Sequence, residues 1–192
     1  MSTPVPAERR LMHTRHVSCR GYERGDGLYE IESTLVDIKP YPVHVGDRGT
    51  IEPGEPFHEM RLQLVIDIDL NIREAAAETV HGPYIGCAPV AAAYARLAGM
   101  SLRSGFIKEA RALLGGTAGC THLTELLGPT VTTAMQMIWH VRDRLAEPKA
   151  ARGQAAAKGD PPPPELEQCG ALRRDGEAVR VHYPVFHIAT TP

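Results

Sequence analysis

The sequence predicts an α+β domain in which an antiparallel sheet from the N-terminal half packs against three helices from the C-terminal half. Between residues 16 and 80, apolar and polar residues alternate as they do in strands. From residue 88 to residue 145, apolar residues recur at helical spacing instead. The length of 192 residues, of which 43% are hydrophobic, fits one folded core with room for a tail.

The strands are expected in pairs. Residues 16–22 and 28–36 form a hairpin across a glycine-containing turn at 24–27. The stretch 41–56 contains closely spaced Gly and Pro residues, which predict a loop with at most a short strand. Residues 60–68 alternate with their even-numbered side apolar, and 72–80 can pair back on them, although the three alanines of 72–80 also suit a helix.

Three helices follow. The first begins near Pro89, which suits a first turn, and ends before Gly99. The second is expected to begin at a Ser104 cap and to end at Gly115. The third runs from near Thr121 to residue 145, with room for a kink at Pro129.

The domain boundaries follow from these elements. We expect a flexible N-terminus at 1–9, a single α+β domain at 10–147, an Ala- and Pro-rich linker at 148–166 and a tail at 167–192. Alternating apolar residues in the tail predict one extra strand at 178–188, which would pair with an open edge of the sheet.

Composition and charge exclude several classes of protein. No apolar run approaches the roughly 20 residues of a membrane-spanning helix, and residues 1–24 lack the apolar core of a secretory signal, so we expect a cytoplasmic protein. Lys and Arg neither cluster strongly nor interleave with aromatic residues, which argues against a nucleic-acid partner. Residues 25–80 hold 12 Asp and Glu against four Lys and Arg, and this acidic segment could meet a basic protein partner. The oligomeric state stays open.

Two of the four cysteines are candidates for chemistry. Cys87 and Cys120 each follow a glycine at the entry to a predicted helix, where free N–H groups favour a thiolate. Disulfides are not expected in a reducing compartment. The alternative is that both cysteines are small buried hydrophobic residues beside tight turns.

Two histidines accompany the cysteines. His122 stands two residues after Cys120, so that one ion could meet both side chains, and His58 directly precedes a predicted strand. Each could instead be an ordinary surface or loop histidine. Among weaker candidates, Asp37 and Lys39 are explained by an ion pair, and His13 and His16 could grip an anionic group such as a phosphate.

These residue types predict a metal site with Cys87, Cys120, His122 and His58 as ligands. Two thiolates with one or two imidazoles suit zinc first and iron second, and the fold must bring them together because their spacing is not that of a zinc finger. A second hypothesis makes Cys120 a catalytic or sulfur-accepting nucleophile with His122 or His58 as base. A third makes the domain a non-enzymatic accessory subunit.

Several motifs in order resemble a bacterial family catalogued as a domain of unknown function, DUF2889, over about residues 10–140. They are Arg10-x-x-His13-x-Arg15, Gly21-Tyr22-x-Arg24-x-Asp26-Gly27-Leu28-Tyr29-x-Ile31-Glu32, Asp37-x-Lys39, His58-x-Met60, Pro83-Tyr84-x-x-Cys87 and Gly119-Cys120-Thr121-His122-Leu123. The resemblance implies no activity. It does imply that the chain after residue 147 is accessory.

Residues 56–140 are also similar, more distantly, to the iron–sulfur cluster assembly scaffold proteins, the NifU N-terminal domain and its IscU-like relatives. The similarity places Cys87 on the second scaffold cysteine, Cys120 on the third and His58 on the aspartate of the first loop. Pro56 stands where the first scaffold cysteine would be, and His122 follows its cysteine where the scaffold histidine precedes it. The similarity therefore implies a metal pocket more directly than it implies cluster assembly.

Overall fold

The computed structural model describes residues 7–145, 162–163 and 166–189. The chain divides into two compact units, residues 1–142 and residues 143–192. Much of the predicted linker at 148–166 lies outside the described residues, as do residues 1–6 of the predicted flexible N-terminus.

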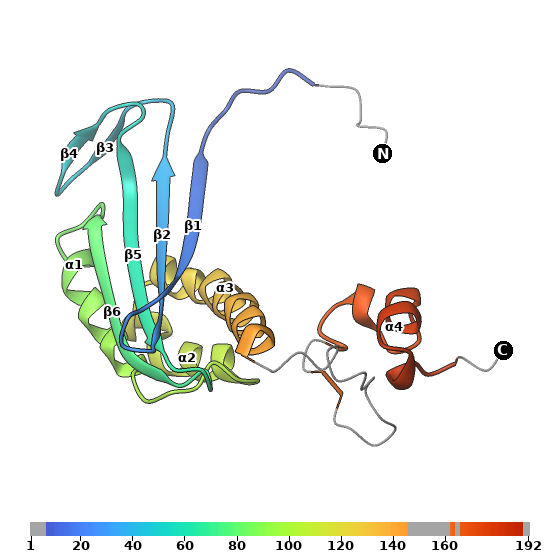
Figure 1. The fold of residues 1–192 in the computed structure, drawn as a ribbon. Helices are drawn as coiled ribbons and strands as arrows, with labels where there is room; N and C mark the ends of the chain where they lie inside the picture. Colours follow the sequence, from blue (N-terminus) through green and yellow to red (C-terminus); the bar gives the residue numbers. More distant parts are fainter. Residues whose placement is uncertain (1–6, 146–161, 164–165, 190–192) are drawn as a thin grey trace. The chain divides into compact units, whose positions relative to one another are not determined.

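A four-stranded antiparallel sheet forms the first layer of the larger unit (Figure 1). Its strands, in spatial order, are β1 (Thr14–Glu23), β2 (Tyr29–Ile38), β5 (Pro56–Ile66) and β6 (Ile72–His81). The segment between β2 and β5 forms a small separate hairpin from β3 (Val43–Val45) and β4 (Gly49–Ile51). The expected strands are thus confirmed, and 72–80 is a strand although its alanines also suit a helix.

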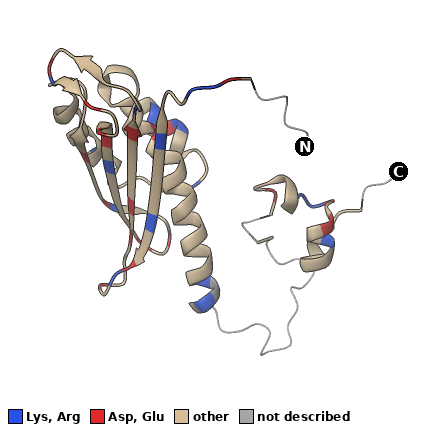
Figure 2. Ribbon diagram, turned by 90° about the horizontal axis from the view of Figure 1, so that it is seen from above, with Lys and Arg blue, Asp and Glu red and all other residues tan. Residues whose placement is uncertain are grey.

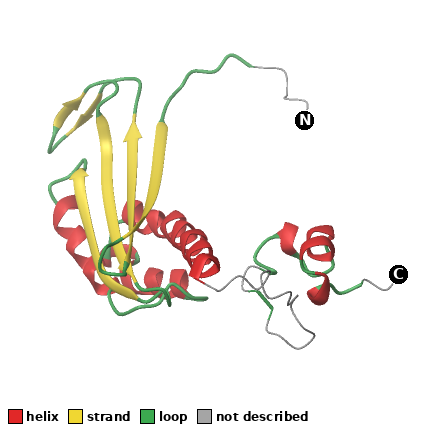
Figure 3. Ribbon diagram, viewed as in Figure 1, coloured by secondary structure: helices red, strands yellow, loops and turns green. Residues whose placement is uncertain are grey.

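Helices form the second layer against one face of the sheet (Figure 3). A short helix α1 (Cys87–Val90) continues as a 3-10 helix η1 (Ala91–Leu97), and α2 (Phe106–Leu114), η2 (Gly116–Ala118) and the long α3 (Thr121–Leu145) follow. Strands first and helices second confirm the predicted α+β class. The core lies between the layers, where residues such as Ile31, Leu64, Tyr94, Phe106 and Leu126 are buried.

The polar residues Ser33 and Thr130 join the two layers inside this core. Their hydroxyl oxygens are 2.7 Å apart and both side chains are buried. Thr130 also donates to the backbone oxygen of Leu126 in α3. Because buried hydroxyl groups must be paired, this contact fixes where α3 crosses β2.

Two local predictions of helix ends need correction. Gly105, with a left-handed φ of 97°, is the N-cap of α2, and Ser104 makes no cap hydrogen bond there. Glycine adopts that backbone conformation without the Cβ clash that other residues incur, so backbone geometry decides this helix start. The first predicted helix is α-helical only over Cys87–Val90 and then tightens into η1.

The smaller unit corrects a third prediction. Residues 178–188, expected to form a strand, form α4 (Glu177–His182) and the 3-10 helix η5 (Pro184–Phe186). Leu166, Val179 and Phe186 are buried together, with Leu172 and Tyr183 packed against them. Of the residues that alternate as in a strand, Val179 is buried and Tyr183 is packed against it, whereas Val181 and Val185 are exposed, so the two faces of a strand do not form here.

Charged residues of both signs occur along the sheet and near the ends of α3 (Figure 2). All four cysteines are free. Among the helices that the structure describes, none combines the length and the apolar character needed to cross a membrane.

Candidate functional site

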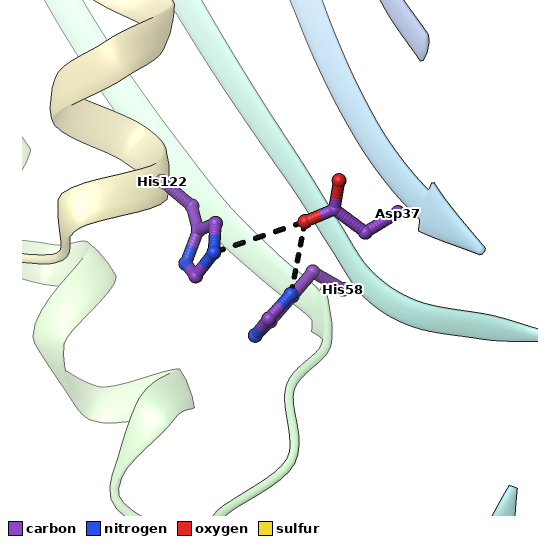
Figure 4. Close-up of side chains that lie close together, drawn as sticks. All are labelled: Asp37, His58 and His122. Carbon is purple, nitrogen blue, oxygen red and sulfur yellow. Dashed lines mark hydrogen bonds and ion pairs between the residues drawn. The ribbon is translucent and has the colours of Figure 1, made fainter. Parts of the chain in front are cut away.

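Asp37, His58 and His122 meet at one end of the sheet (Figure 4). Asp37 is next to last in β2, and in the antiparallel register it faces His58 near the start of β5. Directly opposed residues in neighbouring strands project from the same face, here the face that the helices cover. The first turn of α3 brings His122 over that face. One ligand atom from each residue lies within 4.8 Å of the other two.

The Asp37 carboxylate is the centre of the cluster and is 1% exposed. Arg15 of β1 donates two hydrogen bonds to it, from Nε to Oδ1 at 2.7 Å and from Nη2 to Oδ2 at 2.8 Å. His13 Nε2 lies 3.0 Å from Oδ1, and His58 Nδ1 lies 3.0 Å from Oδ2. Burial alone would raise the pKa of Asp37, but the hydrogen bonds from Arg15, His13 and His58 outweigh it and hold the pKa far below its usual range. Asp37 is therefore an ionised carboxylate.

The two imidazoles of the cluster stack on each other. The ring centroids of His58 and His122 are 3.8 Å apart, with 33° between the ring planes. Burial lowers the pKa of His58, and the nearby His122 lowers it further, while Asp37 opposes both effects. Burial likewise lowers the pKa of His122, against the attraction of Asp37. Burial therefore favours the neutral form of both rings, which is the state in which histidine binds metals.

Cys120 lies beside His122, immediately before α3. Its Sγ is 3.9 Å from His122 Nδ1, and His122 Nε2 is 3.8 Å from Asp37 Oδ2. The buried hydroxyl of Tyr94 holds the Cys120 backbone: it accepts from the Cys120 N–H at 3.1 Å and donates to the Cys120 carbonyl at 2.7 Å. The Thr124 hydroxyl lies 2.7 Å from the same oxygen of Tyr94. These contacts fix the start of α3 and hence the place of His122.

Cys87 lies at the other predicted helix entry, as the first residue of α1. The Cys87 N–H donates to the Tyr84 carbonyl, and the Thr79 hydroxyl donates to the Cys87 carbonyl. In the described part of the chain, the one set of three or more mutually close His, Cys, Asp and Glu ligand atoms is Asp37, His58 and His122, which includes neither cysteine. Cys87 and Cys120 as metal ligands therefore stay predictions.

Sequence reasoning missed the central carboxylate, because it assigned Asp37 to an ion pair with Lys39. The ion pairs of Asp37 are instead with Arg15 and histidines, and none with Lys39 occurs among the described residues. The alternation of β2 contained a signal that Asp37 is buried. Residues 31, 33, 35 and 37 share the buried side of the strand, and a carboxylate on an apolar side needs buried partners.

The basic residues of β1 are divided between the two faces of the sheet. Arg15, paired with Asp37 in the register, reaches the cluster and also forms an ion pair with Glu125 of α3. His16 is exposed and pairs with Val36 in the register, on the face away from the cluster. His13 and His16 therefore do not act together, and an anion-binding role for His16 stays a prediction.

Comparison with known proteins gives one match. Residues 13–136 match the family described as "Protein of unknown function (DUF2889)". No curated protein and no solved structure matches the chain. The similarity to iron–sulfur scaffold proteins therefore gains no support from these comparisons and stays a prediction.

Proposed function

The chain belongs to the family described as Protein of unknown function (DUF2889), and we propose that its α+β domain binds a transition-metal ion through His58, His122 and Cys120. Cys87 is the proposed fourth ligand. The observation that carries the proposal is that two stacked imidazoles meet a buried carboxylate, and that one of them, His122, lies 3.9 Å from the Cys120 thiol. Nitrogen and sulfur ligands favour zinc, with iron, alone or in a cluster, as the alternative.

The distances at Cys120 suit a shared ion. Two ligands of a tetrahedral zinc, one sulfur and one nitrogen, lie about 3.6 Å apart when the zinc–ligand bonds have their usual lengths. The separation of 3.9 Å between Cys120 Sγ and His122 Nδ1 needs only a small movement to reach that value.

Asp37 fits the role of an orienting residue better than that of a ligand. Each of its oxygens already has two partners, and the Arg15 guanidinium balances its charge. A carboxylate that accepts the N–H of one ring nitrogen commonly leaves the other nitrogen of that histidine to bind the metal. With His58 Nδ1 on Asp37, His58 Nε2 is the atom offered to the ion.

Metal analysis of the purified full-length chain tests the proposal. We expect stoichiometric zinc or iron, and zinc titration of metal-depleted protein should give tight binding that Cys120→Ser and His58→Gln weaken by more than about 100-fold. Asp37→Asn should weaken it about 10- to 100-fold, as outer-shell changes do. Cys169→Ser, at an exposed cysteine in the smaller unit, is the matched control. A chain that carries no metal and binds no zinc at micromolar concentration would contradict the proposal.

A second candidate function is supported by the linear order of the same groups. Cys120 Sγ, the His122 ring and the Asp37 carboxylate lie in series, at 3.9 Å and 3.8 Å, as nucleophile, base and orienting acid do in cysteine-dependent enzymes. Such contacts are often long without substrate. In metal-free protein this function requires rapid alkylation of Cys120 by iodoacetamide, slowed by His122→Gln. An alkylation rate of Cys120 no faster than that of the exposed Cys169 would exclude it.

A further inference from the structure

Lys39 places a positive charge beside the candidate site, and no described residue is its counter-ion. It follows β2 directly and is half-buried. Among the described residues, the ion pairs within 4.0 Å include Arg15 with Asp37 and Arg15 with Glu125, but none to the Lys39 ammonium. A half-buried lysine packs its stem and keeps its ammonium at the surface, where it can bind an anion from solution.

The contacts of Lys39 hold the ammonium in place without neutralising it. Nζ is 5.8 Å from the centroid of the Tyr41 ring and 5.5 Å from that of the Phe57 ring. Aromatic faces attract a cation but carry no net charge. Nζ also lies 3.4 Å from His13 Nδ1. Three neighbours thus fix the position of the charge.

The His13 ring connects this charge to the cluster. An ammonium group can only donate, so His13 Nδ1 accepts, and the ring proton belongs on Nε2, which faces Asp37 Oδ1 at 3.0 Å. Arg15 is balanced by Asp37, and Lys39 is then the unbalanced charge one imidazole away from the buried carboxylate.

Phe57 connects the same charge to the proposed metal ligands. Its ring meets the ring of the neighbouring His58 edge-on, with the centroids 4.7 Å apart. The Lys39 ammonium and the His58 imidazole therefore flank one aromatic side chain.

We infer that Lys39 anchors the oxyanion, a carboxylate or a phosphate, of a small ligand that binds beside the histidine cluster. The ammonium donates charge-assisted hydrogen bonds to that group, and the Tyr41 and Phe57 rings hold the ammonium in position. The inference deepens the proposed function, because it names the chemical class of the ligand. It rests on the metal site only for the direction in which the rest of the ligand extends.

The test titrates the full-length chain with sodium acetate and, separately, with inorganic phosphate at low ionic strength, by isothermal calorimetry. Lys39→Gln removes the charge and keeps much of the length of the side chain. Lys108→Gln is the matched control, because Lys108 is an exposed lysine of α2. Zinc titration of both variants is measured in parallel.

We expect at least one of the two anions to bind, and Lys39→Gln to weaken it by about tenfold or more, since hydrogen bonds to a charged group carry that much binding energy. Lys108→Gln should leave anion binding unchanged. Preference for phosphate or for acetate identifies the kind of oxyanion. Equal anion affinity in the Lys39→Gln variant and the wild type, or no binding of either anion at tens of millimolar, would overturn the inference. If Lys39→Gln leaves zinc affinity unchanged, the anion site at Lys39 and the metal site are shown to be tested independently of each other.

Discussion

Replacing Asp37 with Asn tests the reasoning about the buried carboxylate most directly. The substitution keeps the size of the side chain and removes the charge that Arg15, His13 and His58 approach. Breaking a buried ion pair costs about 3–5 kcal/mol when the remaining charge is fully desolvated. Arg15 is 35% exposed and keeps Glu125 as a partner, so we discount the cost to about 2 kcal/mol.

The expected result is a free energy of unfolding lower by that amount, measured by urea titration at pH 7. With a slope of about 1–3 kcal/mol per molar urea, the midpoint falls by about 1 M. Asp69→Asn is the control, since Asp69 is 66% exposed and its ion pair with Arg142 lies at the surface. Surface pairs contribute at most about 1 kcal/mol.

The pH dependence gives an independent check. The folded pKa of Asp37 is depressed, so its contribution to stability is fully present above the unfolded pKa of about 3.9 and is lost as the pH falls further, through the folded pKa. Asp37→Asn should remove that part of the acid-induced loss. If variant and wild type have equal urea midpoints, and if their free energies of unfolding fall equally at acid pH, the assignment of Asp37 as a buried, ion-paired carboxylate is refuted.

Three further predictions concern the groups around the site. Because the folded pKa of His122 is lowered, metal-free protein should lose stability as the pH falls below about 6.5, and His122→Gln should flatten this slope in urea titrations while the exposed His16→Gln does not. Tyr94→Phe removes the hydroxyl that pairs with both backbone groups of Cys120, so thermal unfolding should report a loss of about 1–3 kcal/mol. Tyr22→Phe, at a 41% exposed tyrosine, should change stability little, and equal effects of the two variants would contradict the role given to Tyr94. Ser33→Ala should cost about 1 kcal/mol in urea unfolding, because Thr130 keeps its bond to Leu126, and no measurable change would count against Ser33 as an anchor of α3.

The similarity of the predicted and observed sheet has a local cause. The alternation of apolar and polar residues in a strand is visible in consecutive residues. In β2 and β5 it is clear enough to predict both the strands and their buried sides. The order of strands and helices then predicts the α+β class. The same alternation failed at 178–188, where α4 and η5 form instead: Val179 and Phe186 are buried with Leu166, and the alternating residues Val181 and Val185 are exposed.

The sequence by itself singled out His58, His122, Cys120 and Cys87 as candidates, because their types and their places beside element ends are visible along the chain. Tertiary structure alone decided that the Asp37 carboxylate lies beside both stacked imidazoles and that Arg15 pairs with it. Both facts depend on strand register, which pairs Arg15 with Asp37 and Asp37 with His58. Alternation and the hairpin turn limit the register of β1 on β2. The pairing of Asp37 with His58 spans the β3–β4 segment, and the alternation of each strand predicts its buried side but not which residues face each other. The burial that lowers the pKa values of the two histidines arises in the same way, once α3 covers the end of the sheet.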